Sequence, residues 1–295
     1  MIELKHITKT FNGKKALSDI SFSVSEGEIF GFLGPSGAGK TTTINILTGQ
    51  LVQDSGQAFI LGKDAKDISA DDLLNIGFMS DTVGFYEKMS LYKNLEFFAK
   101  FHHVSTEVLD DLLRTLDLFQ DKDKKAENLS TGMKQRLFLI RAILHTPKIL
   151  FLDEPTTGLD PNQLIEIRQL ISEVGKEKTV LFSTHIMQEV QALCQRVVVI
   201  NKGNIVADEA ESVMTQGSQM SRFEVEFSMP MHHDLAQISS DILKVDALSD
   251  KLYQISARSD VRELLFSFAT EKKITILTMR QLEESMEEIF RALTK

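Results

Sequence analysis

A glycine-rich segment that ends in a lysine and a threonine constrains the fold of this 295-residue chain more than any other feature. It reads GPSGAGKT, from Gly34 to Thr41, and fits the pattern G-x-x-x-x-G-K-[ST]. The apolar run Ile29 to Leu33 precedes it as a buried strand, and a helix carrying Ile44 and Leu47 is expected to follow. Glycines let successive backbone N–H groups turn inward, and a helix N-terminus adds positive potential. The segment therefore predicts a site for the phosphates of a nucleotide.

The lysine and the two threonines at the end of this segment and directly after it have expected roles. Lys40 is placed to reach the β- and γ-phosphate oxygens, Thr41 to bind Mg²⁺ through its hydroxyl, and Thr42 to add a hydroxyl to the phosphates. The alternative, a chance glycine-rich turn, does not explain the strand before it and the helix after it. The remaining residues predicted to bind the nucleotide here are Gly34, Pro35, Ser36, Gly37, Ala38 and Gly39.

Two acids end a later apolar strand, KILFLDE at 148–154. Carboxylates are costly to bury without cations, so a chain that places two at a strand end usually uses them. Phosphoryl transfer needs one carboxylate to hold Mg²⁺ and a second group to orient or deprotonate water. Alone, such a pair is often no more than two exposed acids. About 110 residues after a phosphate loop, we assign Asp153 to Mg²⁺ and Glu154 to catalysis.

The pattern along the chain indicates a mainly parallel sheet covered on both faces, because strands rich in branched apolar residues alternate with helices. Short alternating strands with a turn at Asn12–Gly13 fill residues 1–30, and helical spacing dominates residues 85–145. Further expected elements are a strand at 76–79, a helix at 161–175, a strand at 179–184 and a hairpin at 196–208 around Lys202–Gly203.

The pattern changes after 211–219, which lacks periodicity and is the expected linker. RFEVEF alternates strictly as a half-buried strand, and residues 261–270 and 281–294 have helical spacing. The predicted fold class is α/β: a P-loop NTPase core with N-terminal antiparallel strands and an inserted helical subdomain (about 85–145), plus a small C-terminal α+β domain. The two domains are expected at 1–215 and 216–295.

Three further motifs separate the families that share a phosphate loop and an acidic pair. They are LSTGMKQR (129–136), GLD (158–160) and STH (183–185), in this order. With them the chain resembles the ATP-binding subunit of ABC transporters over roughly residues 1–215, which would make that part an ABC-type ATP-binding domain and the rest an accessory domain.

The resemblance implies roles for five more residues. Phe11 is similar to the aromatic residue that stacks on adenine, with a core phenylalanine as the alternative. Ser130 and Gly132 match the signature residues that contact the γ-phosphate bound to the other subunit. Asp160 matches a loop that crosses the dimer interface, although Asp160 followed by proline is also a good helix N-cap. His185 matches the switch histidine that contacts the γ-phosphate.

The chain departs from the family pattern at two places. Asp81 stands where a glutamine usually joins Mg²⁺ to the transmembrane partner, so we expect Asp81 to meet the metal directly or through water. Thr131 and Met133 replace the common signature residues, while Ser130 and Gly132 are kept. This signature, the acid at 81 and the tail EEIFRALT resemble the bacitracin and lantibiotic export and self-protection branch.

Composition limits the partners and the compartment. A formal charge of −9 disfavours nucleic acid as a partner. The single cysteine, Cys194, fits a reducing compartment. The N-terminus does not resemble a signal peptide, and the apolar runs are shorter than the roughly 20 residues of a membrane span. We expect a cytoplasmic protein, peripheral on the cytosolic face of the cell membrane through a permease.

The expected function is hydrolysis of ATP with Mg²⁺ to power a separate membrane permease, for export of a peptide antibiotic or other drug-like molecule. The second ATP-binding subunit is either another copy or a homologue. One alternative is a soluble ABC ATPase of the translation or DNA-repair type, and a second is a P-loop kinase or GTPase. A third is a subunit that binds ATP without splitting it, against which Glu154 and His185 argue.

Overall fold

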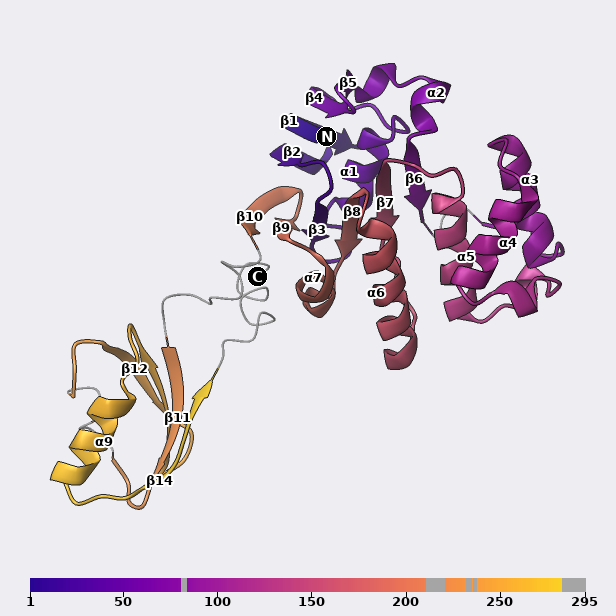
Figure 1. Cartoon of the computed structure of the whole chain (residues 1–295). Coiled ribbons are helices and arrows are strands. Elements are labelled where there is room, and N and C mark those ends of the chain that lie inside the picture. Colours follow the sequence, from indigo (N-terminus) through magenta and orange to yellow (C-terminus); the bar gives the residue numbers. More distant parts are fainter. Residues whose placement is uncertain (81–83, 211–220, 232–234, 236–237, 283–295) are drawn as a thin grey trace. The chain divides into compact units, whose positions relative to one another are not determined.

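The computed structural model describes residues 1–80, 84–210, 221–231, 235 and 238–282 (Figure 1). These residues form two compact units, one up to residue 210 and one from 221 to 282. The predicted linker at 211–219 and the predicted metal ligand Asp81 lie outside the described residues.

A four-stranded antiparallel sheet, in the order β2-β1-β4-β5, begins the first unit and confirms the predicted N-terminal antiparallel strands. Asn12 and Gly13 join β1 to β2 with φ angles of 48° and 78°, the left-handed conformations that a two-residue hairpin turn requires. The strands are β1 (Ile2–Phe11), β2 (Lys14–Val24), β4 (Ser55–Ile60) and β5 (Lys63–Asp64).

The second sheet of this unit has six strands in the order β10-β9-β3-β8-β7-β6. All its pairs are parallel except β9 with β10, which form the predicted hairpin around Lys202–Gly203. The strands are β3 (Ile29–Leu33), β6 (Ile76–Met79), β7 (Ile149–Asp153), β8 (Thr179–Thr184), β9 (Arg196–Asn201) and β10 (Asn204–Ala210). The predicted strands at 76–79 and 179–184 are confirmed.

Helices cover both faces of this central sheet, as the alternation along β3 shows. Phe30 and Phe32 belong to a hydrophobic cluster that they share with Ile44 of α1 (Lys40–Leu47) and with the antiparallel sheet. Gly31 faces the other way, where a Cβ would lie 3.1 Å from Val190 of α7 (Met187–Leu193). Helix α6 (Pro161–Gly175) contacts α7, and its bounds match the prediction.

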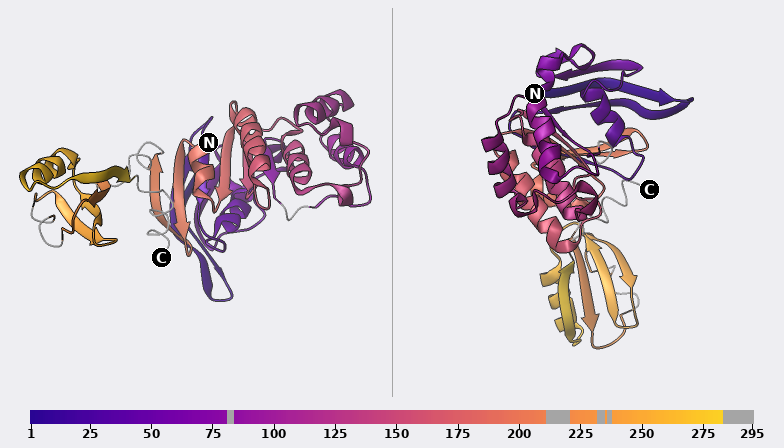
Figure 2. Two further views of the ribbon diagram at one scale, coloured as in Figure 1. Left: turned by 90° about the horizontal axis from the view of Figure 1, so that it is seen from below. Right: turned by 90° about the vertical axis from the view of Figure 1, so that its right-hand side faces the viewer.

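The predicted helical segment consists of α3 (Leu91–Phe101), α4 (Thr106–Thr115) and α5 (Thr131–Ile143), and the short helix α2 (Ala70–Leu73) precedes β6. The helical segment lies beside β6, the edge strand of the sheet, which α5 contacts (Figure 2). Its amphipathic helices bury one stripe each, which includes Leu95 of α3 and Leu113 of α4.

The second unit has its own sheet and core. Its four strands follow the order β12-β13-β11-β14 and are β11 (Ser221–Phe227), β12 (Ile242–Ala247), β13 (Leu252–Ala257) and β14 (Ile276–Leu282). Helix α9 (Arg262–Glu271) packs Leu265 into a cluster with Phe223 and Val225, which confirms the half-buried strand read from RFEVEF.

The helix predicted at 281–294 is wrong at its start, because residues 281 and 282 continue β14, which pairs with β11. The apolar residues of 281–294 have helical spacing, but the backbone of residues 281 and 282 pairs with β11 in the sheet. The remainder, 283–294, lies outside the described residues. Across the part of the chain that the structure describes, no helix combines the length and the apolar character needed to cross a membrane.

The separate core of the second unit predicts a local stability effect. Phe223→Ala removes a fully buried ring and should lower the free energy of unfolding of this unit by about 3–5 kcal/mol. Phe266→Ala is the matched control, because Phe266 is exposed and its loss should cost no more than about 0.5 kcal/mol. Calorimetry of the full chain measures both, and equal losses in the two variants would contradict the assignment of this core.

Candidate functional site

The glycine-rich segment joins β3 to α1 in the predicted strand–loop–helix arrangement. Two of its glycines have no room for a side chain. A Cβ at Gly34 would lie 2.3 Å from the backbone oxygen of Ile200, and a Cβ at Gly39 would lie 2.6 Å from Leu17 Cδ2. Gly39 also has a φ of 116°, which a residue with a side chain rarely adopts. The loop can therefore form only with glycine at these positions.

The loop encloses a hollow of about 270 Å³, here called the phosphate hollow. Its lining combines the loop, the start of α1, the N-terminal sheet and the end of β7, which are far apart in the sequence. The lining residues are Ala16, Ser36, Gly37, Gly39, Lys40, Thr41, Thr42 and Glu154. Ala38 is buried and contributes packing rather than lining.

The Lys40 side chain is only 5% exposed, so its charge needs partners within the protein. Its Nζ donates to the carbonyl oxygens of Gly34 (2.7 Å) and Pro35 (3.2 Å). It also forms an ion pair with Glu154 Oε1 at 3.0 Å. Lys40 thus ties the loop to the acidic pair.

The two acids differ in their surroundings. Asp153 ends β7, and its Oδ2 accepts a hydrogen bond from the Thr41 hydroxyl at 2.8 Å. Its Oδ1 accepts from Ser183 at 2.5 Å. A threonine hydroxyl beside a carboxylate offers the hard oxygen ligands that Mg²⁺ prefers, and Mg²⁺ in such sites takes its other ligands from phosphate and water. Thr41 and Asp153 therefore fit the predicted metal site.

Glu154 follows the strand with a φ of 48°, an uncommon conformation for a non-glycine residue. Its Oε2 accepts from the Thr157 hydroxyl at 3.1 Å and lies 3.1 Å from His185 Nδ1. Burial acts to raise the pKa of Glu154, but the hydrogen bond and charge of Lys40, together with His185 and Thr157, hold it below its ordinary value.

His185 stands directly after β8, on a turn that the preceding threonine organises. The Thr184 hydroxyl accepts from Ile186 N at 3.0 Å and donates to the fully buried carboxylate of Glu189. These contacts fix the backbone on both sides of the histidine. The structure therefore brings together Lys40, Glu154 and His185, which the sequence analysis had assigned to the phosphates and to catalysis.

The signature and interface residues lie elsewhere. Ser130 is the N-cap of α5 and accepts from Met133 N at 3.3 Å, while Asp160 is the N-cap of α6 and accepts from two backbone N–H groups at 3.0 Å. Gly132 lies against Gln163 of α6, whose Cδ is 2.9 Å from the position of a Cβ. Ser130, Gly132 and Asp160 do not line the phosphate hollow.

Phe11 ends β1 and is 45% exposed, so the alternative of a core phenylalanine is wrong. Lys9 Nζ lies 5.5 Å from the centroid of its ring. An exposed ring is available to stack on a planar ligand. It does not line the phosphate hollow.

Sequence reasoning missed Ser183, Thr157 and Glu189 as parts of this network. Ser183 belongs to the quoted motif STH, so a signal was present, but only the pairing of β7 with β8 places it opposite Asp153. Nothing in the local sequence marks the other two.

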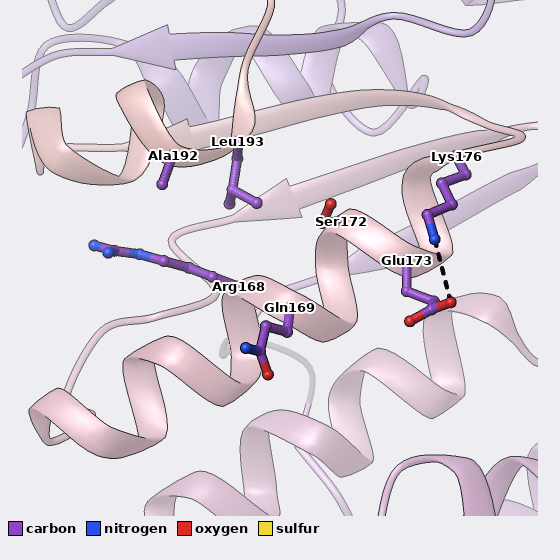
Figure 3. A pocket seen from close by; sticks show the side chains of 7 residues that line it. All are labelled: Arg168, Gln169, Ser172, Glu173, Lys176, Ala192 and Leu193. Atoms are coloured by element: carbon purple, nitrogen blue, oxygen red, sulfur yellow. Dashed lines mark hydrogen bonds and ion pairs between the residues drawn. The ribbon is translucent and has the colours of Figure 1, made fainter.

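A larger hollow of about 390 Å³ lies between α6 and α7 (Figure 3). Arg168, Glu173 and Lys176 contribute to its lining, and Lys176 is paired with Glu173 at 3.3 Å. Its lining includes no residue predicted for the nucleotide site. Size alone therefore does not locate the site in this molecule.

A strand–loop–helix that holds a buried lysine beside two carboxylates at a strand end defines a P-loop nucleoside-triphosphatase site. The family model for "ABC transporter" matches residues 17–157. The bacitracin transport ATP-binding protein BcrA of Bacillus licheniformis is 31% identical over 296 residues, which covers 98% of this chain and 96% of that protein. The linearmycin resistance ATP-binding protein LnrL of Bacillus subtilis is 30% identical over 313 residues, covering 100% and 98%.

A solved structure supports the same relationship. The dimeric ATP-binding cassette MJ0796, in a post-hydrolysis state bound to ADP and Pi, matches with a TM-score of 0.65 at 25% identity, covering 72% of this chain and 99% of that one. This chain belongs to the ATP-binding proteins of ABC transporters, and it is an ATPase. The predicted family, fold class and ATPase activity are confirmed.

The lowered pKa of Glu154 predicts a pH dependence of stability. The charged carboxylate stabilises the folded protein above the ordinary pKa of 4.5, and this contribution is lost as the pH falls through the folded-state pKa. Between about pH 5 and pH 3, the free energy of unfolding should fall more steeply in the wild type than in Glu154→Gln. Urea unfolding at constant ionic strength measures this, and parallel curves for the two proteins would contradict the ion pair with Lys40.

Proposed function

We propose that this chain powers a separate membrane permease from the cytosolic face of the cell membrane, and that the transporter exports a peptide antibiotic or another drug-like molecule. One observation supports the role in ATP hydrolysis: Lys40, Glu154 and His185 lie together at one edge of the parallel sheet. Two relatives that match almost the whole chain, named for bacitracin transport and linearmycin resistance, support the kind of cargo. We place the ATP-binding domain at 1–215 and the accessory domain at 216–295.

The active site is completed by a second ATP-binding subunit, either another copy of this chain or a homologue. Ser130 and Gly132 stand at the N-terminus of α5, where backbone N–H groups and the helix dipole favour a phosphate oxygen. They do not line the phosphate hollow of their own chain, so a partner must bring them to the nucleotide. The dimer of the MJ0796 cassette supports this arrangement.

The side chains divide the reaction among themselves. Lys40 and Thr42 bind phosphate oxygens, and the exposed ring of Phe11 stacks on adenine. Thr41 and Asp153 would hold Mg²⁺, with Asp81 as a further ligand, and the ion would supply positive charge beside the phosphoryl oxygens. Glu154 accepts the proton of the attacking water. His185, hydrogen-bonded to Glu154, orients that carboxylate, and Asp160 faces the partner.

Nucleotide binding changes the state of Glu154. The Lys40 ammonium pairs with the Glu154 carboxylate at 3.0 Å, and with His185 and Thr157 it holds the pKa of Glu154 below its ordinary value against the effect of burial. Phosphate oxygens of the nucleotide compete for the same ammonium. An ammonium that turns to the phosphates leaves the carboxylate free to accept a proton from water.

Glu154→Gln tests the catalytic assignment. The amide keeps the shape of the side chain but accepts no proton, so we expect turnover to fall by about 10²- to 10⁴-fold while ATP still binds. The ATPase rate and equilibrium binding of a fluorescent ATP analogue measure the two effects. Glu173→Gln is the matched control, since Glu173 is exposed and pairs with Lys176, outside the lining of the phosphate hollow, and its rate should stay at the wild-type level. Retained hydrolysis in Glu154→Gln would remove Glu154 as the base.

The helical segment carries the surface proposed to meet the permease. Phe97 and Phe101 lie four residues apart on α3 and are 49% and 74% exposed. The ring of Tyr86 lies 5.6 Å from that of Phe97 in an edge-on arrangement. These three rings form the aromatic patch. Exposed aromatic residues close together are typical of surfaces that bind another protein.

Phe101→Asp tests the role of this patch. A charge on this apolar surface should reduce the amount of permease that co-purifies from membranes by about tenfold or more, which is the effect of losing a hot-spot residue. ATP binding should be kept. Val52→Asp is the control, because Val52 is similarly exposed but belongs to a different part of the first unit. Undiminished co-purification of the Phe101 variant would exclude the patch from the interface.

A further inference from the structure

Ser183 in β8 contacts both acids of the site. It is fully buried, and its hydroxyl donates to Asp153 Oδ1 at 2.5 Å. The hydroxyl oxygen of Ser183 also accepts from the backbone N–H of Glu154 at 3.2 Å. Parallel pairing of β7 with β8 sets Ser183 opposite Asp153, so the contact is built into the sheet.

The hydroxyl completes the fixation of the Asp153 carboxylate. Thr41 donates to Oδ2 at 2.8 Å, and Ser183 donates to Oδ1. With one donor on each oxygen, the plane of the carboxylate cannot turn without breaking a hydrogen bond. When a metal ion recruits Thr41, Ser183 is the donor that remains to orient Asp153.

The same serine holds the strained residue that follows. The N–H of Glu154 lies 3.1 Å from the carbonyl oxygen of Ser183 and 3.2 Å from its hydroxyl. These two acceptors stabilise Glu154 at a φ of 48°, which directs its side chain toward Lys40 and His185. One side chain thus supports the metal ligand and the base together.

We propose that Ser183 is a positioning residue of the Mg²⁺·ATP site, whose hydroxyl orients the Asp153 carboxylate and holds the backbone of Glu154. The proposal rests on the proposed function, in which Asp153 meets the metal and Glu154 takes the proton. A purely structural serine, which only satisfies its own hydrogen bonds inside the protein, is the competing explanation. It would affect stability but not metal affinity.

The experiment measures metal binding separately from turnover. Mn²⁺ replaces Mg²⁺ as a paramagnetic probe, and its binding to the ATP-loaded full chain is titrated by electron paramagnetic resonance in a Glu154→Gln background, which prevents hydrolysis. Loss of a hydrogen bond to a charged ligand in Ser183→Ala should raise the dissociation constant of Mn²⁺ about tenfold or more. ATP affinity in the presence of a chelator should not change. Ser183→Thr, which keeps the hydroxyl, should restore metal affinity.

Thr179→Val is the matched control. Thr179 lies in the same strand and is equally buried, but its hydroxyl accepts from Gly27 N at 3.0 Å, away from the acids. Its loss should lower the melting temperature without changing Mn²⁺ affinity. Ser183→Cys, with its weaker donor, provides the same comparison if the alanine variant does not fold, and an intermediate loss is expected.

The positioning role of Ser183 and the proposed function of the site are contradicted by different results. Unchanged Mn²⁺ affinity in Ser183→Ala, or equal weakening in Thr179→Val, overturns the positioning role of Ser183. Wild-type ATP hydrolysis by Glu154→Gln alone overturns the proposed function of the site instead.

Discussion

The buried positive charge of Lys40 determines how the rest of the site is organised. Burying an ammonium costs on the order of several kcal/mol of desolvation free energy. Oxygen atoms that surround the ammonium offset this cost. Two loop carbonyls and the Glu154 carboxylate supply those oxygens. The loop must therefore close around the lysine, and the end of β7 must stand beside it. Oxygen atoms of the protein itself therefore compensate the charge of Lys40.

The parallel sheet makes this convergence possible. β3 is followed by the phosphate loop, β7 by Glu154 and β8 by His185, and β8 lies between the other two and pairs with both. The register pairs Asp153 with Ser183 and Leu33 with Thr184. Because the carboxyl ends of parallel strands meet at one edge, residues more than 100 positions apart come within hydrogen-bond distance. The sheet order thus decides which side chains can cooperate.

The sequence allowed the fold class to be predicted and pointed to Lys40, Glu154 and His185, which the structure groups together, because those signals are local. A glycine-rich turn, an acidic pair at a strand end and STH each stand in one short segment. The role of Ser183 required the register between β7 and β8, which no local pattern gives. Likewise, Gly132 gave no sign that Gln163 packs against it. The helix expected from residue 281 failed at its start because strand pairing with β11 outweighed helical spacing.

Each unit carries a hydrophobic cluster of its own, and this separation has a consequence for engineering the chain. Among the described residues, the cluster around Phe223 draws its members from the second unit and the cluster around Phe30 draws its members from the first. A substitution that repacks the Phe223 cluster should therefore leave the packing around the phosphate loop intact, so the stability of the C-terminal unit can be tuned without altering the residues that split ATP.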